Sequence, residues 1–242
     1  MIYYDFHIHS CLSPCADDDM TPHNIAGMGY IKGLGAMALT DHNTCKNCPA
    51  FFAACERFGI VPIAGVELST SEDVHLVCLF PTLEAALMFD KELDKHRAKI
   101  DNRPERFGSQ IIMDENDSVA GEFDKLLIAA TDLWMGDAVS LARSFGAAVY
   151  PAHIDREANG IITMLGDVPS EYGFDCVEFR EIKNLDAYFS SYPSINGKKV
   201  LVSSDAHTLG DISEAENALE IPENITEINK IREKIFAYIS KS

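Results

Sequence analysis

Short apolar runs rich in β-forming residues recur along the chain, and each carries an ionisable residue near one end. The expected strands are IYYDFH (2–7), AMALTDH (36–42), IVPIAGVE (60–67), VHLVCLF (74–80), AAVYPAH (147–153), DCVEFR (175–180) and KVLVSSDAH (199–207). Helix-length segments separate most of them; one begins at Thr21 and Pro22, which suit a helix N-terminus, and 226–240 closes the sequence. This alternation predicts an α/β fold with a parallel sheet buried on both faces.

One connection is too short to contain a helix. Only LSTSEDV separates Glu67, at the end of one expected strand, from His75, at the start of the next. A parallel crossover needs about a dozen residues, so we expect an antiparallel hairpin. The hairpin would bring Glu67 and His75 to the same rim of the sheet, where α/β folds build their active sites.

Histidines are concentrated at the strand ends. In DFHIHS, His7 and His9 are two residues apart and therefore share one face of a strand. A single histidine at a strand end is typically a hydrogen-bonded rim residue, but six of the eight histidines fall at such ends. With nearby carboxylates they predict a multinuclear site for zinc, manganese or iron. The candidates are His7, His9, His42, His75, His153, His207, Asp17, Asp41, Glu67 and Asp205.

Composition narrows the class of protein. A chain of 242 residues with 47% hydrophobic residues can bury the core of one large α/β domain or two small ones. No apolar run reaches the roughly 18 residues of a membrane helix, and MIYYDF lacks the basic region of a signal peptide. We therefore expect a cytoplasmic protein with reduced cysteines and no membrane contact. The net charge of −18 disfavours binding of long nucleic acid.

The motifs DFHIHS, ALTDHN, IAGVELS, VHLVCLF, PAH and SSDAH occur in this order. They resemble the motifs of the PHP superfamily (polymerase and histidinol phosphatase), which are metal-dependent phosphoesterases. The resemblance implies a single distorted (β/α)7 barrel over 1–242, with a helical and loop insertion at 84–145. It also implies two or three divalent metal ions: a first held by His7, His9, Glu67 and Asp205, a second by Glu67, His75 and His153, and a third by Asp17, His42 and His207.

Two details of this resemblance leave alternatives open. The family usually has a single aspartate in an SDG-like loop, whereas this chain has ADDDMTP, so Asp18 or Asp19 could replace Asp17 as the ligand. The sequence AHID also departs from the commoner AHP, which leaves the roles of Asp155 and Arg156 undecided.

The candidates for catalysis are Asp41, Arg156 and Arg180. Asp41 precedes His42, and we expect it to orient a metal-bound imidazole, because such rings usually donate their second N–H to a carboxylate or carbonyl. Arg156 and Arg180 each follow an expected strand end and could bind phosphoryl oxygens, or could form surface ion pairs instead. Glu178, within CVEFR, could lie near the site or be buried with a partner elsewhere.

Cysteine spacing offers a competing interpretation. CLSPC and CKNC follow two of the expected metal-binding strands, and paired cysteines of this spacing can hold a structural zinc ion. Inert or redox-sensitive thiols are the alternative. The four residues concerned are Cys11, Cys15, Cys45 and Cys48.

The insertion at 84–145 is the expected location of substrate choice, as a possible lid. We expect a helix over 84–100, with Lys91, Lys95 and Lys99 on one face, either as a solvated surface or as an anion-attracting lid. DENDSVAGEFD is expected to be a turn-rich loop, and TDLWMGDAVSLARSFG an N-capped amphipathic helix.

These observations together predict a metal-dependent hydrolase. We expect a phosphoesterase that acts on a small phosphorylated metabolite or nucleotide, by attack of a metal-bridging hydroxide. One alternative is an exonuclease-like phosphodiesterase that acts on short oligonucleotides. Another is a non-catalytic metal-binding or regulatory protein, which would typically saturate its ions with protein ligands and leave no open position.

Overall fold

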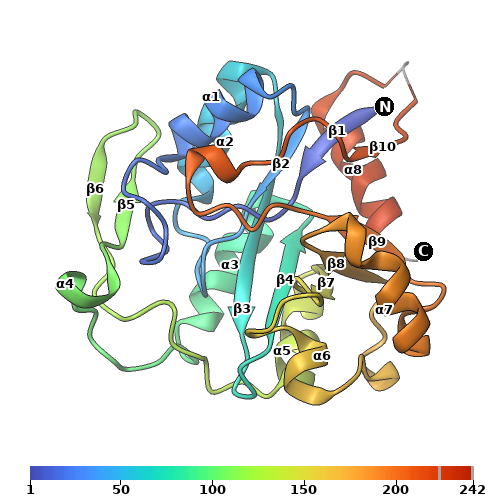
Figure 1. The fold of residues 1–242 in the computed structure, drawn as a ribbon. Helices are drawn as coiled ribbons and strands as arrows, with labels where there is room; N and C mark the ends of the chain where they lie inside the picture. Colours follow the sequence, from blue (N-terminus) through green and yellow to red (C-terminus); the bar gives the residue numbers. More distant parts are fainter. Residues whose placement is uncertain (223–224, 241–242) are drawn as a thin grey trace.

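A curved, mixed sheet of six strands forms the centre of the computed structural model, which describes residues 1–222 and 225–240 (Figure 1). Strands β1 to β3 are parallel, whereas β4 is antiparallel to both of its neighbours, β3 and β7. The order across the sheet is β10 (Ala218–Leu219), β1 (Ile2–Asp5), β2 (Ala36–Leu39), β3 (Val61–Ser69), β4 (His75–Phe80) and β7 (Ala148–Pro151). The short β10 strand, antiparallel to β1, was not expected from the sequence.

A separate parallel pair, β8 (Cys176–Phe179) and β9 (Lys199–Val202), continues the wall. Just beyond β7, the backbone N–H of Ile154 donates to the carbonyl of Glu178 on β8. Just beyond β9, the carbonyl of Ala206 accepts from the N–H of His9, which follows β1. With the short β10 strand set aside, seven strands of the described chain therefore surround the core, and the expectation of a distorted (β/α)7 barrel is confirmed.

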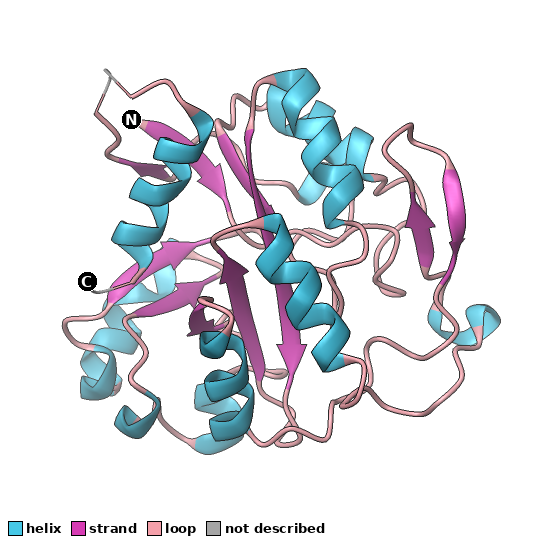
Figure 2. Cartoon of the chain, turned by 180° about the vertical axis from the view of Figure 1, so that it is seen from behind, coloured by secondary structure: helices cyan, strands magenta, loops and turns pink. Residues whose placement is uncertain are grey.

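Helices cover the outer side of these strands (Figure 2). The first begins as expected, because the Thr21 hydroxyl accepts from the Asn24 N–H and Pro22 occupies the first turn. Among the described residues, no helix combines the length and the hydropathy needed to cross a bilayer. The α-helices are α1 (Pro22–Ile31), α2 (Cys48–Phe58), α3 (Leu83–Leu93), α4 (Pro104–Phe107), α5 (Met135–Ser144), α6 (Ile161–Leu165), α7 (Leu185–Ser191) and α8 (Ile228–Ile239).

The expected hairpin joins β3 to β4. Ser69 pairs with His75, so the end of one strand lies beside the start of the next at a common rim. Both strands are buried along their whole length. At Gly65 a Cβ atom would lie 2.8 Å from the Leu79 side chain and 2.9 Å from that of Thr40, so the close approach of the strands requires glycine there.

The expectation of a helix over 84–100 is wrong beyond α3. The helix ends at Leu93, and the next residues form turns, so the three lysines do not share a helical face. The reason is Arg97, whose buried guanidinium bonds the Asp90 carboxylate and, through Nε at 2.7 Å, the carbonyl of Asn43. These tertiary contacts override the helical pattern of the sequence.

Two other expectations for the insertion also needed correction. The segment expected to be a turn-rich loop contains a strand, β6 (Val119–Glu122), which pairs with β5 (Ile111–Met113) to form a hairpin on the left of Figure 1. The α5 helix starts at Met135 and not at Thr131. Its first N–H group is capped from outside the helix, because the Glu72 carboxylate accepts from Met135 N–H at 3.0 Å, while the Thr131 hydroxyl donates to the carbonyl of Ser69.

Candidate metal centre

Glu67, near the end of β3, is surrounded by histidines from other strand ends. His75 Nδ1 lies 2.7 Å and His153 Nε2 lies 2.9 Å from its Oε1 atom. On the other carboxylate oxygen, Oε2, His42 Nδ1 is at 3.0 Å and His9 Nε2 at 3.2 Å. The carboxylate is almost fully buried, with 1% of its surface exposed, so both of its oxygens face imidazole nitrogens and not solvent.

A second carboxylate, Asp205, follows β9 and faces the same cluster. Its Oδ1 atom lies 3.3 Å from His9 Nε2, 3.6 Å from His7 Nε2 and 3.7 Å from His207 Nδ1. The structure thus brings together all six strand-end histidines and two of the predicted carboxylates. Three groups of ligand atoms each lie within 4.8 Å of one another: His7, His9, Glu67 and Asp205; His42, Glu67 and His75; and His9, His42 and His207.

Several buried polar atoms in the cluster lack a hydrogen-bond partner among the described residues. They include Glu67 Oε2, His42 Nδ1 and Asp205 Oδ1. Buried polar atoms in native proteins are nearly always satisfied, and unpaired ones point to a missing ion or water. Imidazole nitrogens and carboxylate oxygens that converge in this way fit divalent transition metals, so the residues match the predicted cofactor.

Outer hydrogen bonds orient two of the imidazole rings. His7 Nδ1 lies 2.8 Å from Glu178 Oε1, and His9 Nδ1 lies 3.0 Å from Ser13 Oγ. Each partner accepts the Nδ1 proton, so Nε2 is the ring atom directed at the cluster, where a metal ion would displace its proton. Glu178 thus lies next to the site, one of the two alternatives open from the sequence.

Asp41 reaches the cluster indirectly. Its carboxylate accepts hydrogen bonds of 2.7 Å from the hydroxyls of Ser10 and Ser13 and from the Ser10 N–H. Through Ser13 it fixes the ring of His9, whereas no hydrogen bond among the described residues joins it to the ring of His42. Sequence reasoning missed Ser10 and Ser13, because short hydroxyl side chains in a loop carry no spacing signal of their own.

Carboxylates and imidazoles in the cluster shift each other's pKa values. Burial lowers the pKa of a histidine, but Asp205 and Glu67 outweigh this effect at His9 and raise its pKa to about 9. Burial would raise the pKa of Glu67, yet the surrounding histidines hold that pKa well below its usual value. At His207 burial prevails and lowers the pKa to about 3. Glu67 is therefore ionised and His207 is neutral, which are the forms that bind metals.

Two candidate ligands have an unusual backbone conformation. His153 has a φ of 27° and Asp205 a φ of 54°. Residues other than glycine rarely adopt a positive φ of this kind. Such residues cost on the order of 1–3 kcal/mol each and cluster at functional sites. Their positions are held by neighbours, since the N–H of His153 donates to Glu178 and the Asp205 carboxylate is bound by Arg156.

The remaining predicted ligand, Asp17, has an exposed side chain. Its backbone N–H donates to the carbonyl of His207 at 3.0 Å, so the loop lies beside the cluster, but Asp17 belongs to none of the three ligand groups. The side chains of Asp18 and Asp19 are exposed as well. A role for any of the three in metal binding stays a prediction.

The two predicted arginines lie in different surroundings. Arg156 Nη1 is 2.8 Å from Asp205 Oδ2, which places this guanidinium at the edge of the cluster. Arg180 directs its Nε to the carbonyl of Ser204 at 3.3 Å. The carboxylate of Asp155 accepts from the N–H groups of Arg180 and of the residue after it, so it orders the loop after β8.

The cysteine pairs do not form a metal site in the described chain. Cys11, Cys45 and Cys48 are buried, whereas Cys15 is exposed. None of the three groups of ligand atoms contains a cysteine. The interpretation as a structural zinc site therefore has no geometric support.

Comparison with known proteins agrees with this geometry. The sequence profile described as "PHP domain" matches residues 5–131, a little over half of the chain. The chain belongs to the PHP domain family. This membership confirms the resemblance drawn from the motifs, and it supports the expectation of a metal-dependent hydrolase.

Known relatives of this PHP domain protein differ in what they act on. A 5'-3' exoribonuclease of Haemophilus influenzae is 32% identical over 114 residues, 43% of this chain and 40% of the relative, so this chain spans well under half of that protein. A putative metal-dependent phosphoesterase from Bifidobacterium adolescentis is similar in structure, with a TM-score of 0.61 at 15% identity over 99% of this chain and 96% of the other.

A second solved structure shares the fold over part of its length. It is a lesion-specific endonuclease from Pyrococcus furiosus, with a TM-score of 0.62 at 18% identity over 86% of this chain and 49% of the other. At these identities the structural likeness establishes the fold alone.

Proposed function

We propose that the protein is a metal-dependent phosphoesterase that hydrolyses a small phosphorylated metabolite or a nucleotide. The observation that supports this most directly is Glu67, a buried carboxylate with imidazole nitrogens within 3.4 Å of both of its oxygens. Such an arrangement is suited to bridge two metal ions. We also propose a cytoplasmic location, in keeping with the absence of disulfides among the described residues.

The three groups of ligand atoms suggest two or three ions of zinc, manganese or iron. His7, His9, Glu67 and Asp205 would hold one of them, and Glu67 would share a second with His75 and with either His42 or His153. When bound, such ions supply a nucleophile near neutral pH and offset charge that develops on a phosphoryl group. No serine or cysteine nucleophile is needed in this scheme.

The protein's own residues would orient the substrate. Arg156 is anchored by one N–H group on Asp205, so its other N–H groups can donate to the oxygens of a phosphoryl group that enters beside the cluster. Glu178 and Ser13 keep the His7 and His9 rings turned toward the cluster, and Asp41 in turn holds Ser13. Arg180, held by the Ser204 carbonyl, would act only on a larger substrate.

A second candidate is exonuclease-like hydrolysis of short oligonucleotides. The similarity to an exoribonuclease favours it, since the match covers 43% of this chain at 32% identity. Both candidates need the same metal centre and differ in how much of the substrate lies outside it.

The test is a hydrolysis screen of phosphomonoesters, nucleotides and short oligonucleotides, with metal analysis of the same sample. We expect turnover of at least one compound, lost in His75→Asn and retained in His96→Asn. His96 is a suitable control, because it lies outside the cluster and pairs with Asp132 at the surface. Bound metals with no turnover of any compound would instead favour a non-catalytic metal-binding protein.

A further inference from the structure

A cavity of about 560 Å³ lies between the end of α3 and residues 123–125 of the insertion. Its size is that of a site for a small ligand. It is not part of the metal centre, and none of the predicted metal ligands lines it. The residues of interest in its lining are Lys46, Lys91, Arg97, Lys99, Phe123 and Lys125.

The lining of the cavity has more basic than acidic residues, the opposite of the chain as a whole. The whole chain has 20 basic against 38 acidic residues, yet five basic and three acidic residues line this cavity. Arg97 is neutralised by Asp90 and Asp94. Lys91 and Lys99 are exposed, and in the described part of the chain no hydrogen bond or ion pair engages either ammonium group. Two uncommitted cations at one cavity suit an anionic ligand.

Hydrogen bonds of Asn43, the residue after His42, link the cavity wall to the loop that carries this metal ligand. Strand β4 begins at the rim and runs away from it, so α3 returns toward the rim and ends there. Arg97, in the cavity wall, donates to the carbonyl of Asn43, the residue after His42. The side chain of Asn43 in turn donates to the carbonyls of Leu127 and Ala129 in the insertion. A ligand in the cavity would therefore lie next to the metal-binding loop.

An aromatic ring completes the cavity. Phe123 is half-buried, with Lys46 Nζ at 5.7 Å and Arg97 Cζ at 5.5 Å from its ring centroid. A positively charged groove with an aromatic ring is the combination that binds single-stranded nucleic acid, because phosphates pair with the cations and a base stacks on the ring. An inorganic anion has no group that could stack on the ring.

From these contacts we infer that the cavity is a nucleotide subsite, which binds one phosphodiester group and its base next to the phosphate held at the metal centre. Lys91 and Lys99 bind the phosphodiester oxygens, and Phe123 stacks on the base. The inference rests on the proposed phosphoesterase function and favours its second candidate, with oligonucleotides of two or three residues as substrates. The volume of about 560 Å³ leaves no room for a longer segment within the cavity.

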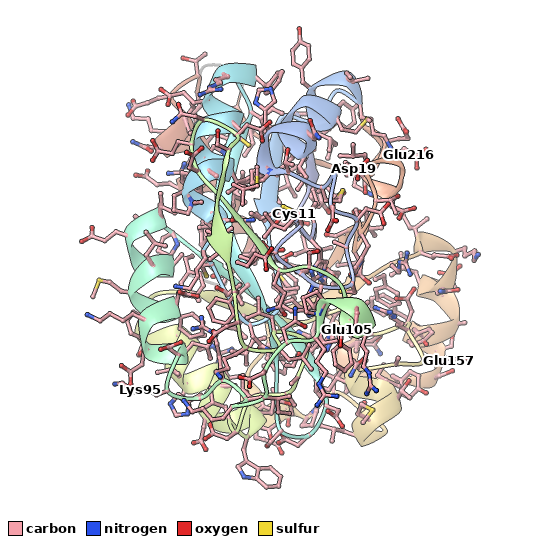
Figure 3. All side chains as sticks on the ribbon, turned by 90° about the vertical axis from the view of Figure 1, so that its left-hand side faces the viewer. Cys11, Asp19, Lys95, Glu105, Glu157 and Glu216 are labelled. Atoms are coloured by element: carbon pink, nitrogen blue, oxygen red, sulfur yellow. The ribbon has the colours of Figure 1, made fainter. Side chains whose placement is uncertain are left out.

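The test compares two substrates and a matched pair of variants. A 5'-phosphorylated adenylate trimer would occupy both sites, whereas p-nitrophenyl phosphate would engage the metal centre alone. For Lys91→Ala/Lys99→Ala, we expect KM for the trimer to rise about tenfold and its salt dependence to become shallower, while kinetics on p-nitrophenyl phosphate stay unchanged. The control is Lys95→Ala, because Lys95 is paired with Glu92 and lies outside the cavity lining, beyond the end of α3 in Figure 3.

A binding arm keeps the inference separate from the proposed function. If neither substrate is hydrolysed, the screen described above decides the proposed function, and affinity for a fluorescein-labelled trimer, measured by anisotropy, still decides the role of the cavity. Weaker binding by the double variant but not by Lys95→Ala would support the subsite. Equal binding or equal KM in the double variant and the wild type, or no binding of the trimer to either protein, would overturn it.

Discussion

The metal centre and the insertion cavity adjoin through the loop after β2, but their charges are arranged in opposite ways. In the metal centre, Glu67 and Asp205 are buried and surrounded by imidazoles. In the cavity, Lys91 and Lys99 are exposed and have no protein partner among the described residues. The first arrangement suits permanently bound ions, and the second suits a ligand that comes and goes. We therefore expect substitutions to separate chemistry from substrate choice.

Removal of the metals should have the largest effect. We expect a chelator to abolish turnover and added zinc, manganese or iron to restore it, because in the proposed scheme the bound ions supply the nucleophile. Cys15→Ser and Cys48→Ser should keep most of the activity in the same assay. A loss of about 10³-fold in either serine variant, with its metals retained, would return a thiol mechanism to consideration.

The hydrogen bond that His7 donates to Glu178 should have the next largest effect. Glu178→Gln removes the charged acceptor for the Nδ1 proton of His7, and we expect metal affinity to fall about 10- to 100-fold. Equilibrium dialysis against a chelator series measures this change. Glu181→Gln is the control, since that carboxylate is exposed and pairs with Lys183. Equal affinities in the two variants would show that Glu178 does not support the centre.

Most of the barrel, but little of the insertion, could be predicted from the sequence, and the reason is physical. Strand ends follow a short-range pattern, so His7, His9 and the hairpin from Glu67 to His75 could be placed without any tertiary information. The end of α3 could not, because it depends on Arg97 reaching the carbonyl of Asn43, a residue 54 positions earlier. Ser13 was missed for the same reason: its role depends on Asp41 in another loop.

The contact between the insertion and the barrel should respond to a single methyl group. Gly108 has a φ of 99°, and a Cβ atom there would lie 2.0 Å from the carbonyl oxygen of Pro14. We expect Gly108→Ala to destabilise this contact by about 1–3 kcal/mol, which lowers the melting temperature while metal content is retained. Gly121→Ala is the control, because its Cβ would meet nothing within 4 Å. Loss of the metals in Gly108→Ala would mean that centre and insertion are not separable.

Thiol labelling should give the smallest perturbation. Cys15 is exposed, whereas burial raises the pKa of Cys11 and of Cys78 to about 12. We expect iodoacetamide at pH 8 to modify Cys15 first, as measured by mass spectrometry. Rapid modification of Cys11 would show that the loop between β1 and α1 opens in solution.

The central claim is that Glu67 bridges metals, and metal stoichiometry of the purified protein tests it most directly. We predict two or three transition-metal ions per chain in the wild type and in the control His96→Asn, and a loss of more than one ion in Glu67→Gln, with the fold checked by circular dichroism. A folded Glu67→Gln protein that retains every ion, or loses only one, would contradict the bridging role of Glu67.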